Sequence, residues 1–215
     1  DWTEKAGLTG EEGPYGVVFA DLSNDSYPDL IVNSGKIFLS EKGQKFTRVK
    51  DDSMFAPNDK ADPPVASHGV VLGDVNNDGF RDVLVCEFSA AHLFLNNGGK
   101  GTFTEITKEA GVENPLWASA AAFFDYDLDG DLDCYLLNNS MVSEANIFPE
   151  KGSREIFDEQ GANMLLRNDD GHFTNVTREA GLYSSAIGFG LGVAVSDINN
   201  DGWPDMYISN DFFER

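Results

Sequence analysis

Short apolar runs recur along the chain, and stretches rich in Asp, Asn and Gly separate them. Apolar runs that are this short and bounded by turn residues are typical of β-strands. Four of them directly precede an acidic stretch, at residues 16–20, 69–73, 120–124 and 192–196. Four more directly follow the same stretches, at residues 30–32, 83–86, 134–137 and 206–209. Each pair is predicted to form a hairpin around its acidic stretch.

A third and a fourth apolar segment complete the repeating unit. The third lies at residues 37–39, 93–95 and 164–166, and the fourth lies at residues 46–49, 103–106 and 173–176. Gly-rich turns such as 96–99 and 168–171 join them, and turns of this composition favour hairpins. Each unit is therefore predicted to be a four-stranded antiparallel meander, and such units stacked around an axis form a β-propeller.

The repeats predict an all-β chain in which residues 1–215 are part of one β-propeller. Complete blades are expected at about 9–50, 69–107 and 120–177, with an insertion at 138–162, a partial blade at 192–215 and the tail of a preceding blade at 1–8. A closed propeller has ~4–8 blades. We therefore expect the remaining blades of a longer chain, or a neighbouring subunit, to cover the open sides.

One further pattern follows the fourth segment of two units. Residues 107–111 and 177–181 both begin with Thr and end with Ala-Gly. Threonine is a favourable cap for the start of a helix, and glycine ends helices in the left-handed conformation. A single helical turn with a threonine cap is therefore predicted at each place.

The acidic stretches are four copies of one nine-residue loop, which we number by positions 1 to 9. Oxygen-bearing side chains recur at positions 1, 3, 5 and 9, and Gly occupies position 6 in three copies. Ca²⁺ takes ~6–8 oxygen ligands, so such a loop can fold around one ion, with position 7 giving its backbone carbonyl. The predicted ligands are Asp21, Ser23, Asp25, Tyr27 and Asp29; Asp74, Asn76, Asp78, Phe80 and Asp82; Asp125, Asp127, Asp129, Asp131 and Asp133; and Asp197, Asn199, Asp201, Trp203 and Asp205.

Three to four structural Ca²⁺ ions are therefore expected. A single copy of the loop could be an ordinary acidic turn, but four copies in register after an apolar strand favour ligands. An EF-hand is disfavoured, because strands flank the loops and the Glu at position 12 is missing. The third loop, with five Asp, is the strongest candidate site. The first loop is the weakest, because Ser23 and Ser26 replace an acidic or amide residue and a glycine.

The net charge of −22, from 37 acidic and 15 basic residues, narrows the choice of partners. Nucleic acids and anionic membrane surfaces repel such a field, so neither is expected to bind. The chain has no apolar run of 18 residues and hence no predicted transmembrane helix. The two cysteines, Cys86 and Cys134, occupy different offsets from their loops. We expect two small buried strand residues, while a disulfide remains open.

These blades resemble FG-GAP/VCBS repeats, the calcium-loop blades of integrin α-subunit propellers. The motif Phe189-Gly190 precedes the fourth loop, as in that family. Residues 163–168, 173–182 and 197–211 are more similar to the secreted ASPIC/UnbV group, which includes cartilage-acidic-protein-like chains. The resemblance implies a seven-bladed propeller that is extracellular or at the cell surface. The Ser at position 6 of the first loop departs from the family pattern.

No catalytic constellation is visible in the sequence. His68, His92 and His172 form no zinc-binding spacing, and neither a nucleophile elbow nor a phosphate-binding loop occurs. The favoured function is a non-enzymatic, calcium-stabilised binding or adhesion module. The alternatives are a glycan-binding or glycan-processing protein and a structural surface or filament subunit. A protein or glycan partner is expected on the face opposite the calcium loops, at the long connections 50–68 and 138–162.

Overall fold

The computed structural model describes residues 3–8, 17–32, 36–49, 69–139, 162–182 and 189–210. In these ranges β-structure dominates, which confirms the predicted all-β class. Three sheets have four strands in sequential order, and a fourth sheet has two. The strands are β1 (Val17–Ala20), β2 (Asp29–Val32), β3 (Lys36–Glu41) and β4 (Lys45–Arg48); β5 (Gly69–Gly73), β6 (Asp82–Glu87), β7 (Ala90–Asn96) and β8 (Phe103–Glu105); β9 (Trp117–Phe124), β10 (Asp133–Asn139), β11 (Met164–Asp169) and β12 (His172–Asn175); and β13 (Gly190–Ser196) with β14 (Asp205–Asn210).

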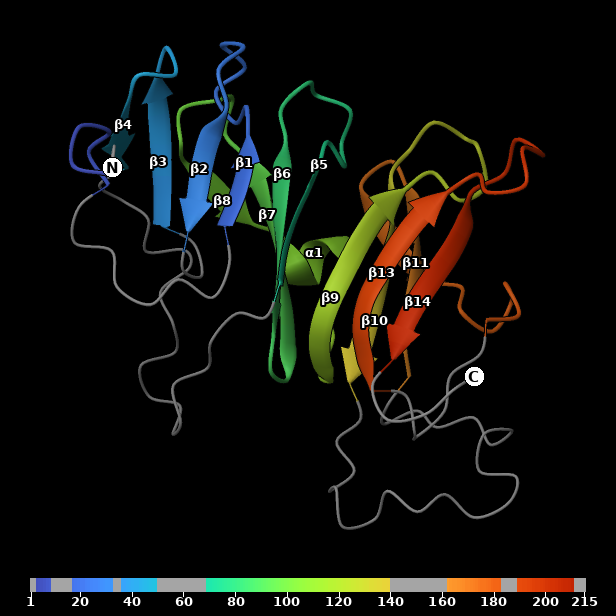
Figure 1. Cartoon of the computed structure of the whole chain (residues 1–215). Coiled ribbons are helices and arrows are strands. Elements are labelled where there is room, and N and C mark those ends of the chain that lie inside the picture. Colours follow the sequence, from blue (N-terminus) through green and yellow to red (C-terminus); the bar gives the residue numbers. More distant parts are fainter. Residues whose placement is uncertain are drawn as a thin grey trace.

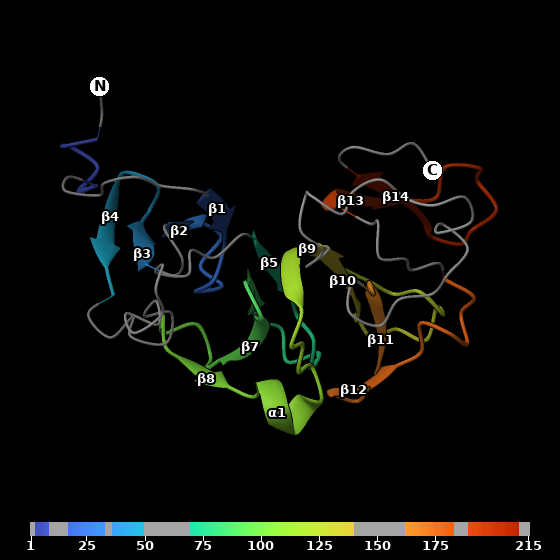
Figure 2. The ribbon, with the colours of Figure 1, turned by 90° about the horizontal axis from the view of Figure 1, so that it is seen from below.

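The four sheets lie side by side in an arc (Figure 1 and Figure 2). The first strand of each sheet lies toward the inside of the arc, whereas β4, β8 and β12 lie toward the outside. The connections between first and second strands all lie at the same end of the sheets, at the top of Figure 1. This is the arrangement of propeller blades, and we call the sheets blades 1 to 4 in chain order.

Both faces of the middle strands are buried, which explains why the apolar runs are continuous instead of alternating. On β6, Val83 and Val85 pack with side chains of blade 1, whereas Leu84 and Cys86 pack with side chains of blade 3. Successive side chains of a strand point to opposite faces, so a strand between two neighbours needs apolar residues at every position. The strand's five residues from Asp82 to Cys86 are accordingly all buried.

Apolar clusters between neighbouring blades form the core. Each cluster removes side chains of two blades from water, so the hydrophobic effect holds the blades to one another. The buried members are Leu22, Ile31, Ile37, Val83, Val85, Phe94 and Phe103 between blades 1 and 2; Val75, Leu84, Cys86, Ala91, Leu93, Ala110, Val112, Ala118, Ala121, Cys134, Leu136, Leu166 and Phe173 between blades 2 and 3; and Phe124, Tyr135, Leu137, Leu165 and Val176 between blades 3 and 4.

The helical turn after the fourth strand forms, but its predicted threonine cap is wrong. Helix α1 (Thr107–Ala110) ends at Gly111, which has φ 78°, and no side chain caps its start. The Thr107 hydroxyl instead accepts a hydrogen bond from the Leu93 N–H at 2.9 Å and donates one to the Glu105 carboxylate at 2.9 Å. Thr177 makes the same pair of bonds in blade 3, with Leu165 and Asn175. The hydroxyl therefore ties the connection to the third strand of its blade.

The two cysteines are free and buried in the cluster between blades 2 and 3. Burial raises the pKa of the Cys86 thiol to about 12, and it raises the pKa of the Cys134 thiol as well. Buried thiols of raised pKa are unreactive. Both residues therefore act as small apolar side chains, and no disulfide joins them.

Apolar side chains remain exposed on the outer faces of blades 1 and 4. Phe19 on β1 is 59 % exposed, and Tyr207 on β14 is 67 % exposed. Ile198, at position 2 of the fourth loop, is 66 % exposed, whereas Leu22 and Val75 at the same position are 1 % exposed beneath the next blade. These are the faces for which the repeat pattern predicts a cover.

Several predicted features lie outside the described residues. They include the start of the first blade (9–16), the connection 50–68 and residues 140–161 of the insertion. Within the described ranges, no helix is long and apolar enough to cross a membrane.

The close contact between blades 1 and 2 can be tested with two adjacent glycines. Gly98 and Gly99 both have φ +77°, but an added Cβ at Gly99 would lie 2.6 Å from the Ser23 carbonyl oxygen, and one at Gly98 would meet nothing within 4 Å. Gly98→Ala should cost about 1–2 kcal/mol of left-handed strain. Gly99→Ala should cost a further ~1–3 kcal/mol from the clash. Equal losses in urea unfolding would contradict the contact.

Candidate metal centre

All four loops have the same backbone conformation. Two positions in each loop have positive φ, which an L-residue other than Asn, Asp or His seldom adopts and glycine adopts freely. The requirement explains the recurrent Asn at position 4 and Gly at position 6. The residues and their φ angles are Asn24 59°, Asn77 55°, Leu128 63° and Asn200 60° at position 4, and Ser26 71°, Gly79 89°, Gly130 100° and Gly202 89° at position 6.

The aspartates at positions 1 and 5 fold the loop. In the second loop, the Asp74 carboxylate accepts hydrogen bonds from the N–H groups of Asp78 and Gly79, at 3.0 and 2.8 Å. The Asp78 carboxylate in turn accepts from the N–H of Phe80 at 2.8 Å. The same bonds recur in the other three loops. They hold both carboxylates within the turn, where their remaining lone pairs are available to a cation.

The aspartate at position 9 joins the loop to the third strand of its blade. Asp82 is fully buried; its Oδ2 accepts from the Val75 N–H at 2.9 Å and its Oδ1 from the Asn96 N–H at 2.8 Å. Asp29 and Asp133, also fully buried, make the equivalent bonds. In the fourth loop, Asp205 accepts from the Ile198 N–H at 3.0 Å.

Two of the position 9 carboxylates, Asp82 and Asp133, lie in an environment that disfavours negative charge. Burial raises the pKa of Asp82 and of Asp133 to about 6, against the opposing effect of their backbone hydrogen bonds. Burial also raises the pKa of Asp127, and the neighbouring charges of Asp129 and Asp125 raise it further. A bound cation would offset both the burial and the mutual repulsion.

The third loop has the donor set that fits a hard cation best. Oxygens of Asp125, Asp127 and Asp133 lie within 4.8 Å of one another, the only such carboxylate group of three in the described ranges. The Oδ1 atom of Asp127 is buried and has no hydrogen-bond partner. Buried polar atoms without a partner are costly, and ion coordination removes the cost. Carboxylate oxygens are the ligands that Ca²⁺ prefers.

Position 3 differs between the loops. In the second and fourth loops, Asn76 and Asn199 donate a hydrogen bond to the Asp at position 5, at 3.0 and 2.9 Å. In the first loop, the Ser23 hydroxyl oxygen is buried without a partner, as is Asp127 Oδ1 in the third. Converging carboxylates are thus found in the third loop, at positions 1, 3 and 9, and the predicted ligands of the other loops stay a prediction. Position 3 has a hydrogen-bond partner in the two loops where it is Asn.

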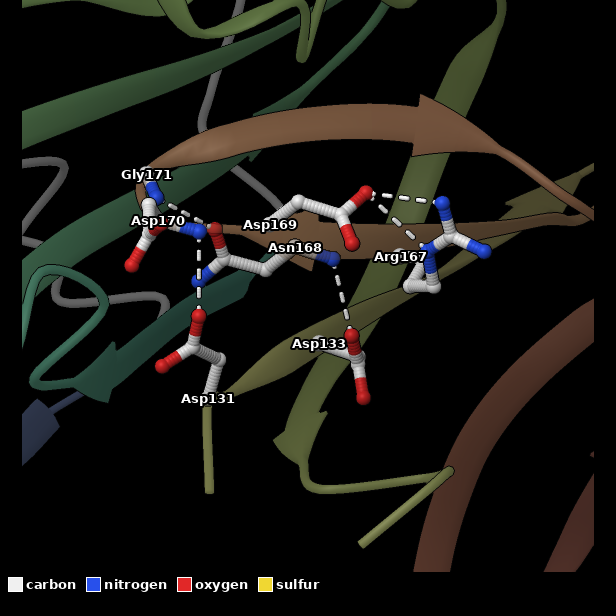
Figure 3. A network of polar contacts seen from close by, with 7 residues as sticks. All are labelled: Asp131, Asp133, Arg167, Asn168, Asp169, Asp170 and Gly171. Atoms are coloured by element: carbon white, nitrogen blue, oxygen red, sulfur yellow. Dashed lines mark hydrogen bonds and ion pairs between the residues drawn. The ribbon is translucent and has the colours of Figure 1, made fainter. Parts of the chain in front are cut away.

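The side chains at position 7 point away from the loop interior. The rings of Tyr27 and Phe80 lie over the turn between the third and fourth strands, against Gly43 and Gly99. Asp131 instead accepts a hydrogen bond from the Asn77 amide at 2.8 Å. It accepts another from the Asp170 N–H at 3.0 Å (Figure 3). The side chains of Tyr27, Phe80 and Asp131 are therefore engaged elsewhere, and the role of the position 7 carbonyl as a ligand stays a prediction.

Two asparagines that the sequence reasoning did not single out belong to this centre. Asn96 and Asn168 begin the turn after the third strand, and they are 4 % and 0 % exposed. The Asn168 N–H donates to Asp133, and its Oδ1 accepts from the Gly171 N–H (Figure 3). Both Gly-rich turns begin with Asn, which could have indicated a shared role. Asn is, however, common in turns of this kind, so its presence needed no further explanation.

Comparison with known proteins identifies the repeats. The model of the FG-GAP-like repeat matches residues 74–136 and 156–208, more than half of the chain. The chain belongs to this family. Both matched segments contain copies of the nine-residue acidic loop, which the structure places at one end of the blades. The expected family resemblance is thereby confirmed.

Two further proteins are similar to this FG-GAP-like chain. Cartilage acidic protein 1 of Xenopus tropicalis is 28 % identical over 213 residues, which is 95 % of this chain and 30 % of that protein. The chain thus spans less than a third of that relative. A solved structure that describes recognition of non-reducing terminal N-acetylglucosamine by an Agrocybe aegerita lectin is 20 % identical, with TM-score 0.44, and covers 91 % of this chain and 43 % of that one.

The left-handed requirement at position 4 predicts a stabilising substitution. Leu128 is 52 % exposed and adopts φ 63°, where the other FG-GAP-like loops of the chain have Asn. Leu128→Asn should therefore stabilise the protein by about 0.5–1 kcal/mol, since Asn is several-fold enriched in this conformation. Leu128→Ala, which also lacks that preference, is the control and should give no gain. A melting temperature that rises equally for both variants would contradict the explanation.

Proposed function

We propose that the chain is an extracellular, non-enzymatic binding module whose loops bind structural Ca²⁺. The observation that supports it most directly is the third loop, where three carboxylates converge and Asp127 Oδ1 is buried without a hydrogen-bond partner. The repetition of the same carboxylate framework in the other loops extends the proposal to three or four ions. In the third loop, Asp125, Asp127 and Asp133 would hold the ion, which would neutralise their converging charges.

The expected affinity suits an extracellular protein. Calcium sites in extracellular modules have Kd values of ~10⁻⁴–10⁻³ M, and solvent-exposed loops with few fixed ligands belong to that class. Positions 1 and 5 of these loops are partly or fully exposed, whereas position 9 is buried in the first three loops and partly exposed in the fourth. The similarity to a protein named for cartilage and for its acidity supports the same location for this acidic chain.

We propose binding instead of catalysis because the loop carboxylates already have structural tasks. Those at positions 1, 5 and 9 accept backbone hydrogen bonds in the second loop, and a coordinated carboxylate is a poor proton donor. His92 is the one described histidine in contact with carboxylates, at 2.8 Å from Glu105 and 3.9 Å from Glu87. The hydroxyl that contacts this group, that of Thr107, is buried and holds the Leu93 N–H, so it has a structural task as well.

The proposed partner surface is the face opposite the calcium loops. A cavity of about 690 Å³ lies there in blade 2, between residues 89–92, 105–109 and 113–115. On the same side, the ring of Phe88, which is 42 % exposed, lies tilted at 57° to the ring of Trp117, with their centroids 5.4 Å apart. Loops and cavities on a rigid scaffold are common binding sites. A neutral N-acetylglucosamine oligomer and a lysine-rich peptide are suitable probes of this surface. Hydrogen exchange measured with each probe would show which residues become protected, and protection confined to the calcium loops would contradict this placement.

Calorimetric titration with Ca²⁺ tests the proposal at one side chain. Asp127→Asn removes one charge with little change of shape, and the third site should then bind on the order of tenfold more weakly or worse, since one unit charge beside a cation is worth about 1–4 kcal/mol. The matched control is Asp170→Asn, which removes an equal charge from an exposed neighbour. If both variants bind Ca²⁺ like the unaltered chain, or if the unaltered chain releases no heat of binding, the proposal is wrong.

A further inference from the structure

A continuous chain of hydrogen bonds connects the first three loops. The Asn96 side-chain amide donates to the Leu22 carbonyl of the first loop at 2.9 Å, while its backbone N–H donates to Asp82 of the second. Asn168 repeats this one blade further, to the Val75 carbonyl at 2.8 Å and to Asp133. The residue at position 2 connects each asparagine to the preceding loop, because its own N–H donates to the position 9 carboxylate of that loop.

Each asparagine has its hydrogen-bonding groups engaged. The Asn168 amide also donates to the Leu132 carbonyl at 3.1 Å, and its oxygen accepts from Gly171 at 2.8 Å. Asn96 makes the equivalent bonds with Arg81 and Gly99. Buried networks in which each group is paired are rigid, and a displacement at one member is felt at the next. The two asparagines therefore lie between adjacent loops as fixed links.

A second contact runs parallel to this chain nearer the surface. The Asn77 side chain, at position 4 of the second loop, donates to the Asp131 carboxylate of the third loop at 2.8 Å. Between the first and second loops, Asn24 donates to the Gly79 carbonyl at 3.4 Å. The second and third loops thus have the stronger surface contact, so the coupling between them is the best place for a test.

We propose that Asn96 and Asn168 are positioning residues that couple Ca²⁺ binding between neighbouring loops. An ion at one loop would fix its position 9 carboxylate, which holds the N–H of the residue at position 2. The carbonyl of that same residue accepts from the asparagine of the next blade, which would be fixed in turn. That asparagine donates to the position 9 carboxylate of the next loop, which is thereby already ordered when its ion arrives. The proposal rests on calcium binding and adds that the sites load cooperatively.

Blade 1 indicates which substitution removes the asparagine contact to the preceding loop and leaves the rest of the turn intact. Ser40 occupies the position of the two asparagines, and it keeps the N–H bond to Asp29 and the turn bond from Gly43 while lacking an amide donor. Asn168→Ser therefore removes the two side-chain amide bonds and retains the bonds to Asp133 and Gly171. The exposed Asn97→Ser is the matched control.

The loops can be read separately by NMR. The amides of Gly79 and Gly130, at position 6 of the second and third loops, report the Ca²⁺ midpoint of each loop during a titration with Ca²⁺ alone. The second loop is disabled by Asp74→Asn with Asp78→Asn, neither of which lies on the hydrogen-bonded chain. Disabling it should raise the Ca²⁺ midpoint at Gly130 about fivefold or more, the lower range of allosteric coupling. With Asn168→Ser, but not with Asn97→Ser, that shift should disappear.

The outcomes separate the possibilities. An unchanged Gly130 midpoint after the second loop is disabled overturns the coupling, and so does a shift that persists in Asn168→Ser. A Gly130 amide that does not respond to Ca²⁺ at all refutes the proposed function instead. If the second-loop variant fails to fold, the reciprocal experiment, with Asp125→Asn and Asp127→Asn read at Gly79, gives the same decision because coupling is reciprocal.

Discussion

Asp29, Asp82 and Asp133 have no exposed surface, and each accepts a backbone N–H on both of its carboxylate oxygens. One bond closes the acidic loop and the other attaches it to the third strand of the blade. The loop, the first hairpin and the third strand are thereby held in one arrangement. A buried charge of this kind is stable only with hydrogen bonds and a nearby opposite charge. In the third loop, the carboxylates of Asp125 and Asp127 converge with Asp133 and supply a place for that charge.

The blades depend on this arrangement for their contacts with one another. Position 2 presents its side chain to the next blade, as Leu22 and Val75 do, and presents its carbonyl to Asn96 or Asn168. The polar link and the apolar cluster therefore begin at the same residue. A loop that changed shape would disturb both at once. This gives a physical reason why the proposed structural ions would belong at the end of every blade instead of at one site.

The sequence predicted the blades well because their strands and turns follow local patterns. Apolar runs, hairpin turns and the nine-residue loop located β6, β7 and their counterparts to within a few residues. The third blade began earlier than predicted, at Trp117, since Ala-rich β9 has a weak apolar signal. The roles of Asn96, Asn168 and Thr107 could not be predicted, because their partners lie on other strands or blades. The loop pattern predicted which side chains could hold an ion but not that Asp131 contacts Asn77.

The most direct test is to compare the thermal unfolding of the chain in three solutions. One contains a calcium chelator, one contains millimolar Ca²⁺, and one contains Mg²⁺ at the same concentration as the Ca²⁺. A ligand that binds only the folded state stabilises it by RT ln(1 + [L]/Kd), and several sites add their contributions. The melting temperature should therefore rise with Ca²⁺, and it should rise much less with Mg²⁺, which demands a tighter octahedral geometry. A melting temperature that is the same in chelator and in Ca²⁺ would contradict the claim that ions complete the loops.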